Sequence, residues 1–486
     1  MAFRLMVYMD GRLVVFALLF YGSLVFAVEP KHLSFEQIQS FTNSKTPRAD
    51  ALIALNRILH KVYGEPRRIT DAKIKSGPSY QSIRVTDWNI ERGFKFDLIK
   101  SLIQDSQAYV QRLAMNQQSE FKEELDLLKD TDIFTLNEVD WGIQRTGYRN
   151  IASEFAQLFN ANYSFATEFL ELAPGLLNDP QLDKSKYKGL HGNAIVSKFP
   201  IVSSKVLRLP TCYDWFSEEL TKLSVLERIR RESSDIVINE KIITEIRQGS
   251  RLALFADIKL PNGDLISVIS THLENRTEPF CRERQLQAIL DHISTIQNPV
   301  ILAGDLNNFE KSAESTSFKK AFNKRIRDPG FMAMMGINYF NPYSLITNVS
   351  TSVVGFIRKH RNPTKINIPV ILPNKARKLF LMIKRFRFAD LNGFDLSGDN
   401  KWSYRGKSSD NRFSNSNQIA RIGFVETFKF NRSFGVAKYK IDWIFVKPID
   451  RAGRQQYFPA FGRTLKDFNQ VTGISDHHPI TVELIL

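Results

Sequence analysis

Apolar residues recur along the chain with two different periods, and the first, helical period covers residues 31–63. The apolar positions at helical spacing are Leu52, Leu55, Leu59 and Val62. Ser34 and Gln37 have the S-x-x-Q spacing of a capping box at a helix N-terminus. We therefore predict an N-terminal helical extension over residues 28–80 whose residues 31–63 are helical and pack on the main domain.

From Ile83 onward the pattern changes to short β-rich runs, interrupted by a predicted helical stretch near residues 96–128. The runs are IRVTDW, DIFTLNEV, GNAIVSKF, ALFADIKL, LISVISTHL, PVILAGDL, IDWIFVKP and ITVELIL. Strands in this number, each followed by a polar loop, predict an α/β or α+β layered domain over residues 81–486.

The first 28 residues differ from the rest. Arg4 and Arg12 precede the uncharged run Leu13–Val28, and small residues stand before a predicted cut after Ala27. This pattern is typical of a signal peptide over residues 1–27 and predicts export to the periplasm or the medium. The alternative is an uncleaved anchor, although a bilayer span takes about 20 apolar residues. A second run of this length is absent from the sequence, so we expect no transmembrane span after signal removal.

Composition and charge limit the class of partner. Hydrophobic residues make up 43% and charged residues 24% of the 486 residues, which is typical of a folded globular chain. The formal net charge of +16 favours polyanions, either nucleic acid or an anionic membrane surface. The sequence gives no indication of the oligomeric state.

Cysteine occurs twice, as Cys212 and Cys281. In an exported protein the two residues could form one disulfide, and two separate thiols in the core are the alternative. The sequence has no Cys/His spacing typical of zinc, so we do not expect a structural zinc site.

Polar residues stand at or near the ends of most of the predicted strands. They are Asn89, Glu91, Glu138, His272, Asp305, Asn307, Asp442, Asp476 and His477. Asp and Asn singly are common in turns for local reasons. The repetition in run after run predicts a site, because side chains from several strands converge outside the strand ends of layered sheets.

The residue types indicate the chemistry. Carboxylate and carboxamide oxygens such as those of Asn89 and Glu138 suit Mg²⁺, which keeps water and substrate phosphate oxygens among its ligands. A histidine beside a carboxylate can act on a water molecule. A serine nucleophile elbow, a P-loop and a GxGxxG motif are all absent from the sequence. We therefore predict metal-assisted attack of water on a phosphoester.

The motifs WN, NE, GDLN and SDHHP, in this order, resemble those of the endonuclease/exonuclease/phosphatase superfamily. This deoxyribonuclease I-like superfamily includes deoxyribonuclease I, apurinic endonucleases, neutral sphingomyelinases and inositol-polyphosphate 5-phosphatases. The resemblance covers residues 83–308 and 420–486. It implies a four-layer sandwich, in which two mixed β-sheets pack face to face between helices.

The resemblance also implies a metal site. Asn89 and Glu138 would coordinate the ion, with Glu91 of the same loop as a further candidate ligand. Asp476 would lie beside this ion or a second one. The expected ion is Mg²⁺, with Mn²⁺ and Ca²⁺ as alternatives.

The remaining motif residues would carry the catalysis. Asp305 and Asn307 would orient the water and hold the phosphate, and His272 would donate to a phosphate oxygen. Asp442 would pair with His477. In the family, this histidine is interpreted either as activating the water or as stabilising the charge that develops on phosphorus.

Three further residues are assigned by the same resemblance. Arg251 stands where relatives carry a phosphate-facing arginine, and a salt bridge before a strand is the alternative. Glu168 is a candidate to orient His272. His478 follows the catalytic position, and we expect it to pack in the core, because adjacent strand residues point to opposite faces.

Two predicted insertions, at about 211–250 and 315–425, bear on which class of substrate the protein binds. Residues 356–407 contain thirteen Lys or Arg and three acidic residues. Within them, residues 372–388 predict an amphipathic helix that could lie on an anionic membrane or follow a nucleic-acid backbone. A solvated cationic face on a packed helix is the third alternative.

Three hypotheses follow. The first is an exported divalent-metal-dependent nuclease, which the net charge favours. The second is a lipid-directed phosphodiesterase or phosphatase, similar to a sphingomyelinase or a phosphoinositide 5-phosphatase, with peripheral membrane contact. The third is a binding protein on the same scaffold, which the complete set of motif residues disfavours.

Overall fold

The computed structural model describes a set of residues that includes all the predicted site residues. The described residues are 4–9, 12–17, 32–43, 47–64, 75–76, 81–172, 182–221, 245–308, 376–395, 427–429, 438–449, 453 and 457–485. The chain divides into two units, Met1–Lys31 and His32–Leu486. Most of the second predicted insertion, and the middle of the first, lie outside the described residues.

In the first unit, strands β1 (Arg4–Met9) and β2 (Arg12–Ala17) pair as an antiparallel hairpin. The assignment of residues 1–27 to an export signal stays a prediction. Within the described ranges, none of the helices has the length and apolar character needed to cross a bilayer.

The second unit begins with the predicted helical extension, formed by α1 (Phe35–Asn43) and α2 (Ala49–His60). The capping box is confirmed: Ser34 N–H donates to Gln37 Oε1 at 2.9 Å, and Gln37 N–H donates to Ser34 Oγ at 3.3 Å. The predicted helical face is wrong in two positions, because Leu52 is 47% exposed and Val62 lies in a strand after α2 has ended. The buried face is instead that of Ala51, Leu55 and Ile58.

The larger sheet is mixed and has nine strands, in the order β10-β7-β8-β6-β5-β18-β17, with β3 added on β7 and β4 on β5. Its strands are β3 (Val62–Tyr63), β4 (Lys75–Ser76), β5 (Gln81–Arg92), β6 (Ile133–Trp141), β7 (Asn162–Glu171), β8 (Leu190–Ser197), β10 (Arg247–Gly249), β17 (Phe458–Thr464) and β18 (Ile480–Ile485). The β5–β6 pair is parallel and the other pairs are antiparallel. The predictions missed β7, which is buried along its whole length.

The smaller sheet has five strands, in the order β16-β13-β12-β11-β9. They are β9 (Ile201–Arg208), β11 (Leu252–Lys259), β12 (Leu265–His272), β13 (Val300–Asp305) and β16 (Asp442–Lys447). Here β12 and β13 are parallel and the other pairs antiparallel. A separate two-stranded ribbon consists of β14 (Phe428–Lys429) and β15 (Lys438–Tyr439).

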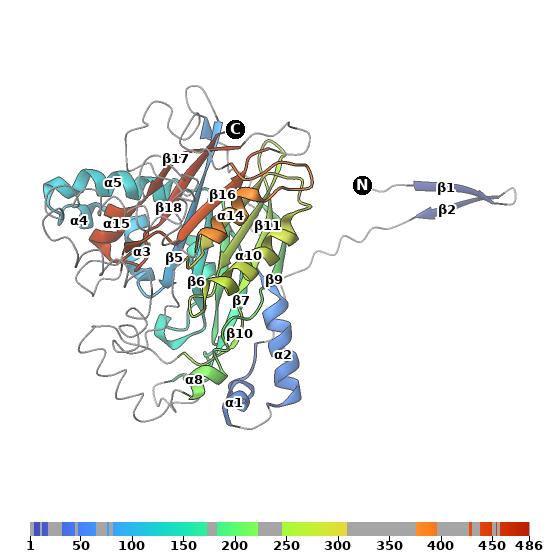
Figure 1. Ribbon diagram of the computed structural model, residues 1–486, viewed down its shortest axis with the longest axis horizontal. Coiled ribbons are helices and arrows are strands. Elements are labelled where there is room, and N and C mark those ends of the chain that lie inside the picture. Colours follow the sequence, from blue (N-terminus) through green and yellow to red (C-terminus); the bar gives the residue numbers. More distant parts are fainter. Residues whose placement is uncertain are drawn as a thin grey trace, which may run out of the picture. The chain divides into compact units, whose positions relative to one another are not determined.

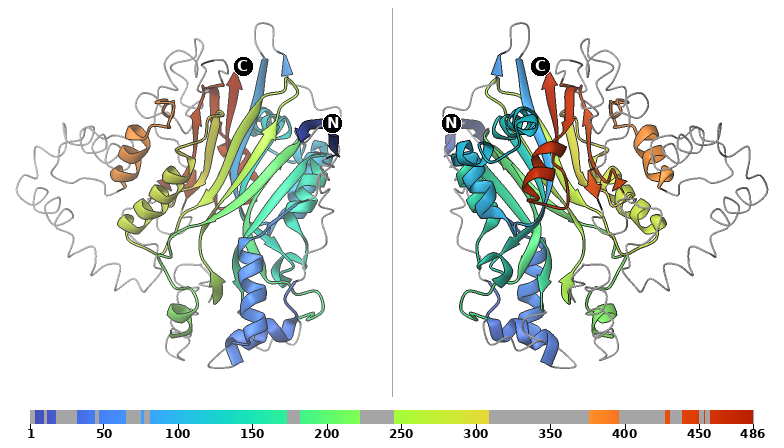
Figure 2. Two further views of the ribbon diagram at one scale, coloured as in Figure 1. Left: turned by 90° about the vertical axis from the view of Figure 1, so that its right-hand side faces the viewer. Right: turned by 90° about the vertical axis from the view of Figure 1, so that its left-hand side faces the viewer.

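Helices cover the outer face of each sheet (Figures 1 and 2). Those packed on the larger sheet include α3 (Phe96–Gln104), α4 (Gln107–Val110), α5 (Met115–Lys129), α6 (Ile151–Leu158) and α15 (Lys466–Thr472). Those packed on the smaller sheet are α10 (Pro279–Ile293) and α14 (Arg377–Arg385). The single helix predicted near residues 96–128 is therefore three helices. The short α8 (Ser217–Thr221) and the 3-10 helix η1 (Gln144–Thr146) lie in connections.

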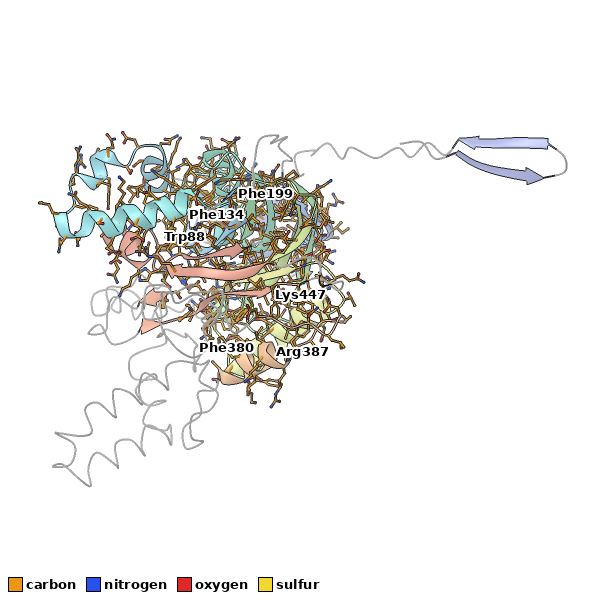
Figure 3. All side chains as sticks on the ribbon, turned by 90° about the horizontal axis from the view of Figure 1, so that it is seen from above. Trp88, Phe134, Phe199, Phe380, Arg387 and Lys447 are labelled. Carbon is orange, nitrogen blue, oxygen red and sulfur yellow. A yellow bond between two sulfur atoms is a disulfide. The ribbon has the colours of Figure 1, made fainter. Side chains whose placement is uncertain are left out.

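Three apolar clusters hold these layers together. One lies between the two sheets and includes Val85, Val268 and Val446, while the other two join each sheet to its helices. Figure 3 labels Phe134 of one outer cluster, Phe199 of the central cluster and Phe380 of the other. This confirms the predicted four-layer sandwich of two mixed sheets between helices.

A disulfide joins Cys212, which follows β9, to Cys281 in α10. Of the two alternatives left open by the sequence, the structure thus has the disulfide. It attaches the segment after β9 to the helix that covers the smaller sheet.

Candidate active site

Three predicted catalytic residues lie side by side in the smaller sheet because of strand register. His272 at the end of β12 is opposite Asp305 at the end of β13, and Asp305 is opposite Asp442 at the start of β16. His272 Nε2 lies 3.4 Å from Asp305 Oδ2. Residues from three separate motifs therefore meet at one edge of this sheet.

His477 reaches the same place from the loop between α15 and β18. Its Nδ1 lies 3.0 Å from both carboxylate oxygens of Asp442, and its Nε2 lies 3.8 Å from Asp305 Oδ2. The ring of Phe428 packs against the imidazole, with 4.9 Å between ring centroids. The predicted pairing of Asp442 with His477 is present, and Nε2 is the ring atom directed to Asp305.

Hydrogen bonds to Asn89 of β5 and to Asn469 of α15 hold the loop around His477 in place. Ser475 Oγ donates to Asn89 O at 2.7 Å and accepts from His477 N–H at 3.0 Å. Asn469 of α15 donates from its amide nitrogen to the carbonyl oxygen of His477 at 2.9 Å. His478 contacts the same amide through its Nδ1 at 3.1 Å and is buried, which agrees with the expected packing role.

The net effect of burial and neighbouring charges is to raise the pKa values of His477 and Asp305 and to lower that of His272. Burial opposes protonation of His477, but Asp442, Asp476 and Asp305 raise its pKa well above the usual value. Burial and the Asp442 charge raise the pKa of Asp305 to about 8. Burial and nearby cations, Arg251 first, hold the pKa of His272 well below its usual value. His477 is thus the cationic imidazole of the site and His272 the neutral one.

Asn307 follows Asp305 in a left-handed backbone conformation, with φ of 43°. Its N–H donates to Asp305 Oδ1 at 2.8 Å, and its side-chain amide donates to Leu273 O at 2.9 Å. This backbone conformation costs free energy in a residue other than glycine and is retained where the surroundings impose it. Here it places the Asn307 side chain between two strand ends.

Two of the predicted metal ligands come from bulges in the larger sheet. The register between β5 and β6 shifts after Asn89, and that between β6 and β8 shifts between Leu136 and Val139. Glu91 and Glu138 lie in these bulges with φ of 48° and 53°. A bulge re-aims a side chain that regular alternation would direct elsewhere, and bulges are common beside active sites.

Glu91, Glu138 and Asp476 lie close enough to affect one another. Burial, Asp476 and Glu138 raise the pKa of Glu91 to about 7. Burial raises the pKa of Asp476, and the charge of Glu138 adds to this. Neighbouring carboxylates that repel one another are the kind of oxygen cluster that a divalent cation stabilises, and the side chain of Asp476 is exposed. We call Glu91, Glu138 and Asp476 the carboxylate cluster, and its chemistry fits the predicted Mg²⁺.

Asn89 lies beside this cluster. Its Oδ1 accepts from Glu91 N–H at 3.0 Å and keeps a second lone pair for an ion. Its buried amide nitrogen has no hydrogen-bond partner among the described residues. The side chain is therefore only partly satisfied by the protein.

A second group that could hold a metal consists of Asp305, Asp442 and His477, whose ligand atoms lie within 4.8 Å of one another. In this group both oxygens of Asp442 already face His477 Nδ1. An imidazole also suits transition metals better than Mg²⁺. Residue chemistry therefore favours the carboxylate cluster for an ion such as Mg²⁺ and this group for acid–base chemistry, and the metal site stays a prediction.

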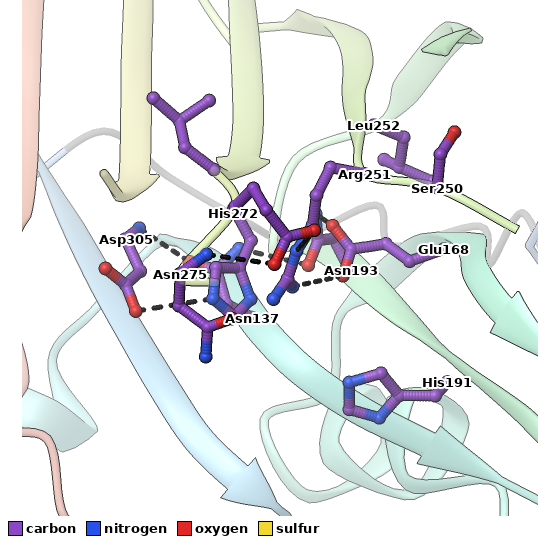
Figure 4. Close-up of polar contacts among 12 residues, drawn as sticks. Asn137, Glu168, His191, Asn193, Ser250, Arg251, Leu252, His272, Asn275 and Asp305 are labelled. Atoms are coloured by element: carbon purple, nitrogen blue, oxygen red, sulfur yellow. Dashed lines mark hydrogen bonds and ion pairs between the residues drawn. The ribbon is translucent and has the colours of Figure 1, made fainter. Parts of the chain in front are cut away.

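A chain of contacts leads from Arg251 to Asp305 (Figure 4). Arg251 binds Glu168 at 2.9 Å, and the other oxygen of Glu168 accepts from Asn193 at 3.2 Å. Asn137 donates to Asn193 at 3.1 Å and accepts from Asp305 N–H at 2.9 Å. Arg251 is thus part of a buried ion pair, and its contact with phosphate stays a prediction. Glu168 binds Arg251 and Asn193, so the expected orientation of His272 by Glu168 is not seen.

Sequence reasoning missed Asp87, Asn137 and Asn193. Asp87 is fully buried, accepts from Thr135 Oγ1 at 2.7 Å, and has its pKa raised by burial and by the charges of Asp442 and Asp305. Asn89, Asn137 and Asn193 stand next to one another across β5, β6 and β8. Two signals were available, since Asp87 directly precedes the WN motif and Asn137 is the first residue of the NE motif.

Comparison with known proteins agrees with this geometry. The sequence profile described as "Endonuclease/Exonuclease/phosphatase family" matches residues 88–477. The chain therefore belongs to this family, and its members hydrolyse phosphoesters. Among curated proteins, no match was found.

Solved structures of the same family align with low similarity. A family protein from Beutenbergia cavernae DSM 12333 is 15% identical, with 83% of this chain and 72% of that chain covered and a TM-score of 0.33. The human Nocturnin catalytic domain with bound sulfate is 14% identical, with 87% and 99% covered and a TM-score of 0.36. The 3′ phosphatase NExo from Neisseria, bound to a product DNA hairpin, is 12% identical, with 83% and 99% covered and a TM-score of 0.38.

Proposed function

We propose that this phosphoester hydrolase is an exported, divalent-metal-dependent nuclease that cleaves nucleic-acid phosphodiesters. The observation that carries the proposal is the position of the His477–Asp442 pair, which faces Asp305 beside the carboxylate cluster. His477 Nε2 lies 3.9 Å from Asp476 Oδ1 of that cluster. A phosphate held by an ion there would be within reach of both catalytic groups.

The roles follow from the pKa shifts and contacts. Glu91, Glu138 and Asp476 would hold the metal, which would supply charge stabilisation to the phosphate. Asp305, in its ionised form, accepts the proton of the attacking water. His477, kept protonated by Asp442, stabilises the charge that develops on phosphorus. Asn307 and the neutral His272 hold phosphate oxygens by hydrogen bonds.

The described part of the basic insertion favours nucleic acid over a membrane surface. The apolar side chains of α14, among them Leu379, Phe380 and Ile383, are buried against the smaller sheet and α10. The face left exposed is cationic and consists of Lys378, Lys384, Arg385 and the adjacent Arg387. A bilayer takes up the apolar face of an amphipathic helix, whereas a phosphate backbone is attracted by the charge. Together with the net charge of +16, this supports the nuclease.

Export is proposed from the N-terminal pattern of the sequence. The Cys212–Cys281 disulfide supports it, because disulfides persist in oxidising compartments. The signal of residues 1–27 would be removed on export, and N-terminal sequencing of the protein recovered from the medium or periplasm would test this.

The test of function is a parallel assay on plasmid DNA, RNA, and liposomes that contain sphingomyelin and phosphoinositides, with Mg²⁺ present. His477→Ala is the matched inactive control, and EDTA followed by Mg²⁺ or Mn²⁺ tests the metal. We expect cleavage of nucleic acid that both EDTA and His477→Ala abolish. Lipid turnover alone would replace the nuclease with the lipid-directed hydrolase, and chelator-resistant cleavage would refute the metal site.

A further inference from the structure

Four arginines surround one carboxylate beside the active site. Arg247 lies 2.6 Å from Glu245 Oε1, and Arg92 hydrogen-bonds the same oxygen. The charges of Arg145 and Arg276 also act on Glu245, and the four cations together hold its pKa far below the usual value, although burial opposes this. We call Arg92, Arg145, Arg247 and Arg276 the arginine cluster.

The arginine cluster borders the carboxylate cluster. Arg92 directly follows Glu91 in the bulge of β5 and shares its left-handed backbone, with φ of 65°. Arg145 binds Asp140, which stands two residues after Glu138 in β6. A group bound by Arg92 would therefore lie next to the predicted metal ligands.

Aromatic rings and acids other than Glu245 hold the arginine side chains of the cluster in place. Arg247 lies over the rings of Phe169 and Trp215, with 5.3 and 4.9 Å to their centroids, and Arg276 lies 4.4 Å from the centroid of Trp215. Arg145 Nε binds Asp140 at 2.7 Å. Because these contacts do not involve Glu245, most of the cluster would keep its shape if Glu245 left.

Within the described residues, the ion pairs of the arginine cluster balance only when Glu245 is counted. The acids in these pairs are Asp140, Glu171, Glu219 and Glu245. Without Glu245 these pairs leave one positive charge in excess, and Arg92 keeps no ion pair among the described residues. Guanidinium groups arranged around one anion are the preferred receptor for phosphate, which they bind through paired hydrogen bonds. The Glu245 carboxylate thus occupies a place that suits a phosphate group.

We propose that the arginine cluster is a subsite for a second, non-scissile phosphate of the nucleic-acid backbone, and that Glu245 occupies this subsite until the substrate displaces it. The proposal rests on the proposed function, because it takes the neighbouring carboxylate cluster as the place of phosphoester cleavage. Glu245 then acts as an internal competitor that favours substrates with phosphates on consecutive residues over isolated phosphate monoesters.

The test measures binding without turnover, in the His477→Ala protein with EDTA. The probes are pyrophosphate, a single-stranded DNA oligonucleotide, and phosphoinositide-containing vesicles. Glu245→Gln keeps the size of the side chain and removes its charge. We expect it to tighten binding of pyrophosphate and of the oligonucleotide by about tenfold. Adding Arg247→Gln or Arg92→Gln should remove this gain. If the more buried Arg247 is needed for folding, the Arg92→Gln variant alone provides the test.

The matched control is Glu483→Gln, which breaks a comparable glutamate–arginine pair, Glu483 with Arg84 at 3.2 Å, at the β18–β5 pairing away from the site. It should leave all three affinities unchanged. Unchanged binding in Glu245→Gln would overturn the subsite and make the cluster an ordinary ion-pair network. A gain for vesicles alone would overturn the assignment to nucleic acid.

Failure of this inference can be told from failure of the proposed function. Hydrolysis is measured with His477 intact and binding with His477→Ala, so each result is read separately. Nuclease activity with no effect of Glu245→Gln refutes the subsite only. A tenfold gain in binding by a protein that cleaves no nucleic acid supports the anion subsite and refutes the nuclease.

Discussion

The side-chain oxygen of Asn137 accepts a 2.9 Å hydrogen bond from the backbone N–H of Asp305. Asn137 belongs to the larger sheet and Asp305 to the smaller one, so this contact joins the two sheets at the active site. The amide nitrogen of Asn137 is also bound, to Asn193 at 3.1 Å. Asn137 thus fixes the position of the proposed base without facing the substrate itself.

Asn137→Ala should therefore impair catalysis as well as stability. It leaves the N–H of Asp305 buried and unpaired, which we expect to lower the free energy of unfolding by about 1–3 kcal/mol. Since Asp305 then loses one of the contacts that fix its position, kcat should fall about tenfold or more with little change in KM. Steady-state kinetics and urea unfolding measure the two effects.

Asn162→Ala is the control for Asn137→Ala. Asn162 is also buried in the larger sheet, and its amide donates to Ser197 O and Phe199 O at 3.3 and 3.0 Å. This variant should lose stability and keep its kcat. Equal losses of kcat in both variants would show that Asn137 acts through stability alone.

Asp442→Asn should change the pH dependence of activity. The carboxylate of Asp442 is the largest influence raising the pKa of His477, so the imidazolium persists above neutral pH and is lost as pH rises through that raised pKa. If the imidazolium is the active form, kcat/KM falls on the alkaline side, and in Asp442→Asn this fall moves to lower pH by about one unit or more. Profiles of kcat/KM against pH for the two proteins provide the measurement. An alkaline limb at the same pH in both would show that His477 is not the group responsible.

Gly304→Ala should destabilise the smaller sheet. Gly304 precedes Asp305 with φ of 144°, and an added Cβ would lie 1.8 Å from Thr271 O. We expect a loss of about 4 kcal/mol or more, or failure to fold. Gly263→Ala separates the cost of the positive φ from the cost of the steric clash, because Gly263 has φ of 91° and nothing within 4 Å of an added Cβ. Thermal unfolding of both variants should show the smaller loss in Gly263→Ala.

Reduction of the Cys212–Cys281 disulfide should lower stability. The bond closes a loop with a sequence separation of 69, and breaking it should cost about 2–5 kcal/mol. We expect the Tm to fall on addition of dithiothreitol. The double variant Cys212→Ser/Cys281→Ser should have the lower Tm and be insensitive to the reductant. Alkylation of both cysteines without reduction would contradict the bond.

The sequence predicted most of the elements and the main site residues, and its errors have identifiable physical causes. Many strands with alternating or continuous apolar runs were found, but β7, β9 and β17 were among those missed. The sequence of β7, NYSFATEFLE, mixes polar and apolar residues while all its side chains are buried. Helical spacing also selected Leu52, whose neighbours leave it exposed. Burial of a position depends on what packs on it, which local periodicity does not contain.

The active site shows the same difference between what the local sequence predicts and what packing decides. The motifs named His477, Asp442 and Asp305 because their residue types and strand-end positions can be recognised locally. Their convergence at distances of 3–4 Å depends on register, on bulges and on the packing of one sheet on the other. Glu245 and the arginine cluster carry no motif and could not have been selected from the sequence.

By itself, the sequence determined the layered fold class and the set of polar strand-end residues, and it predicted their metal and phosphate chemistry, because these depend on residue type and short-range pattern. The tertiary structure alone decided that Arg251 pairs with Glu168, that Asn137 holds Asp305, and that Glu245 lies among the arginines. The reason is that these relationships join residues far apart in the chain, and only the pairing of strands and the stacking of two sheets bring them into contact.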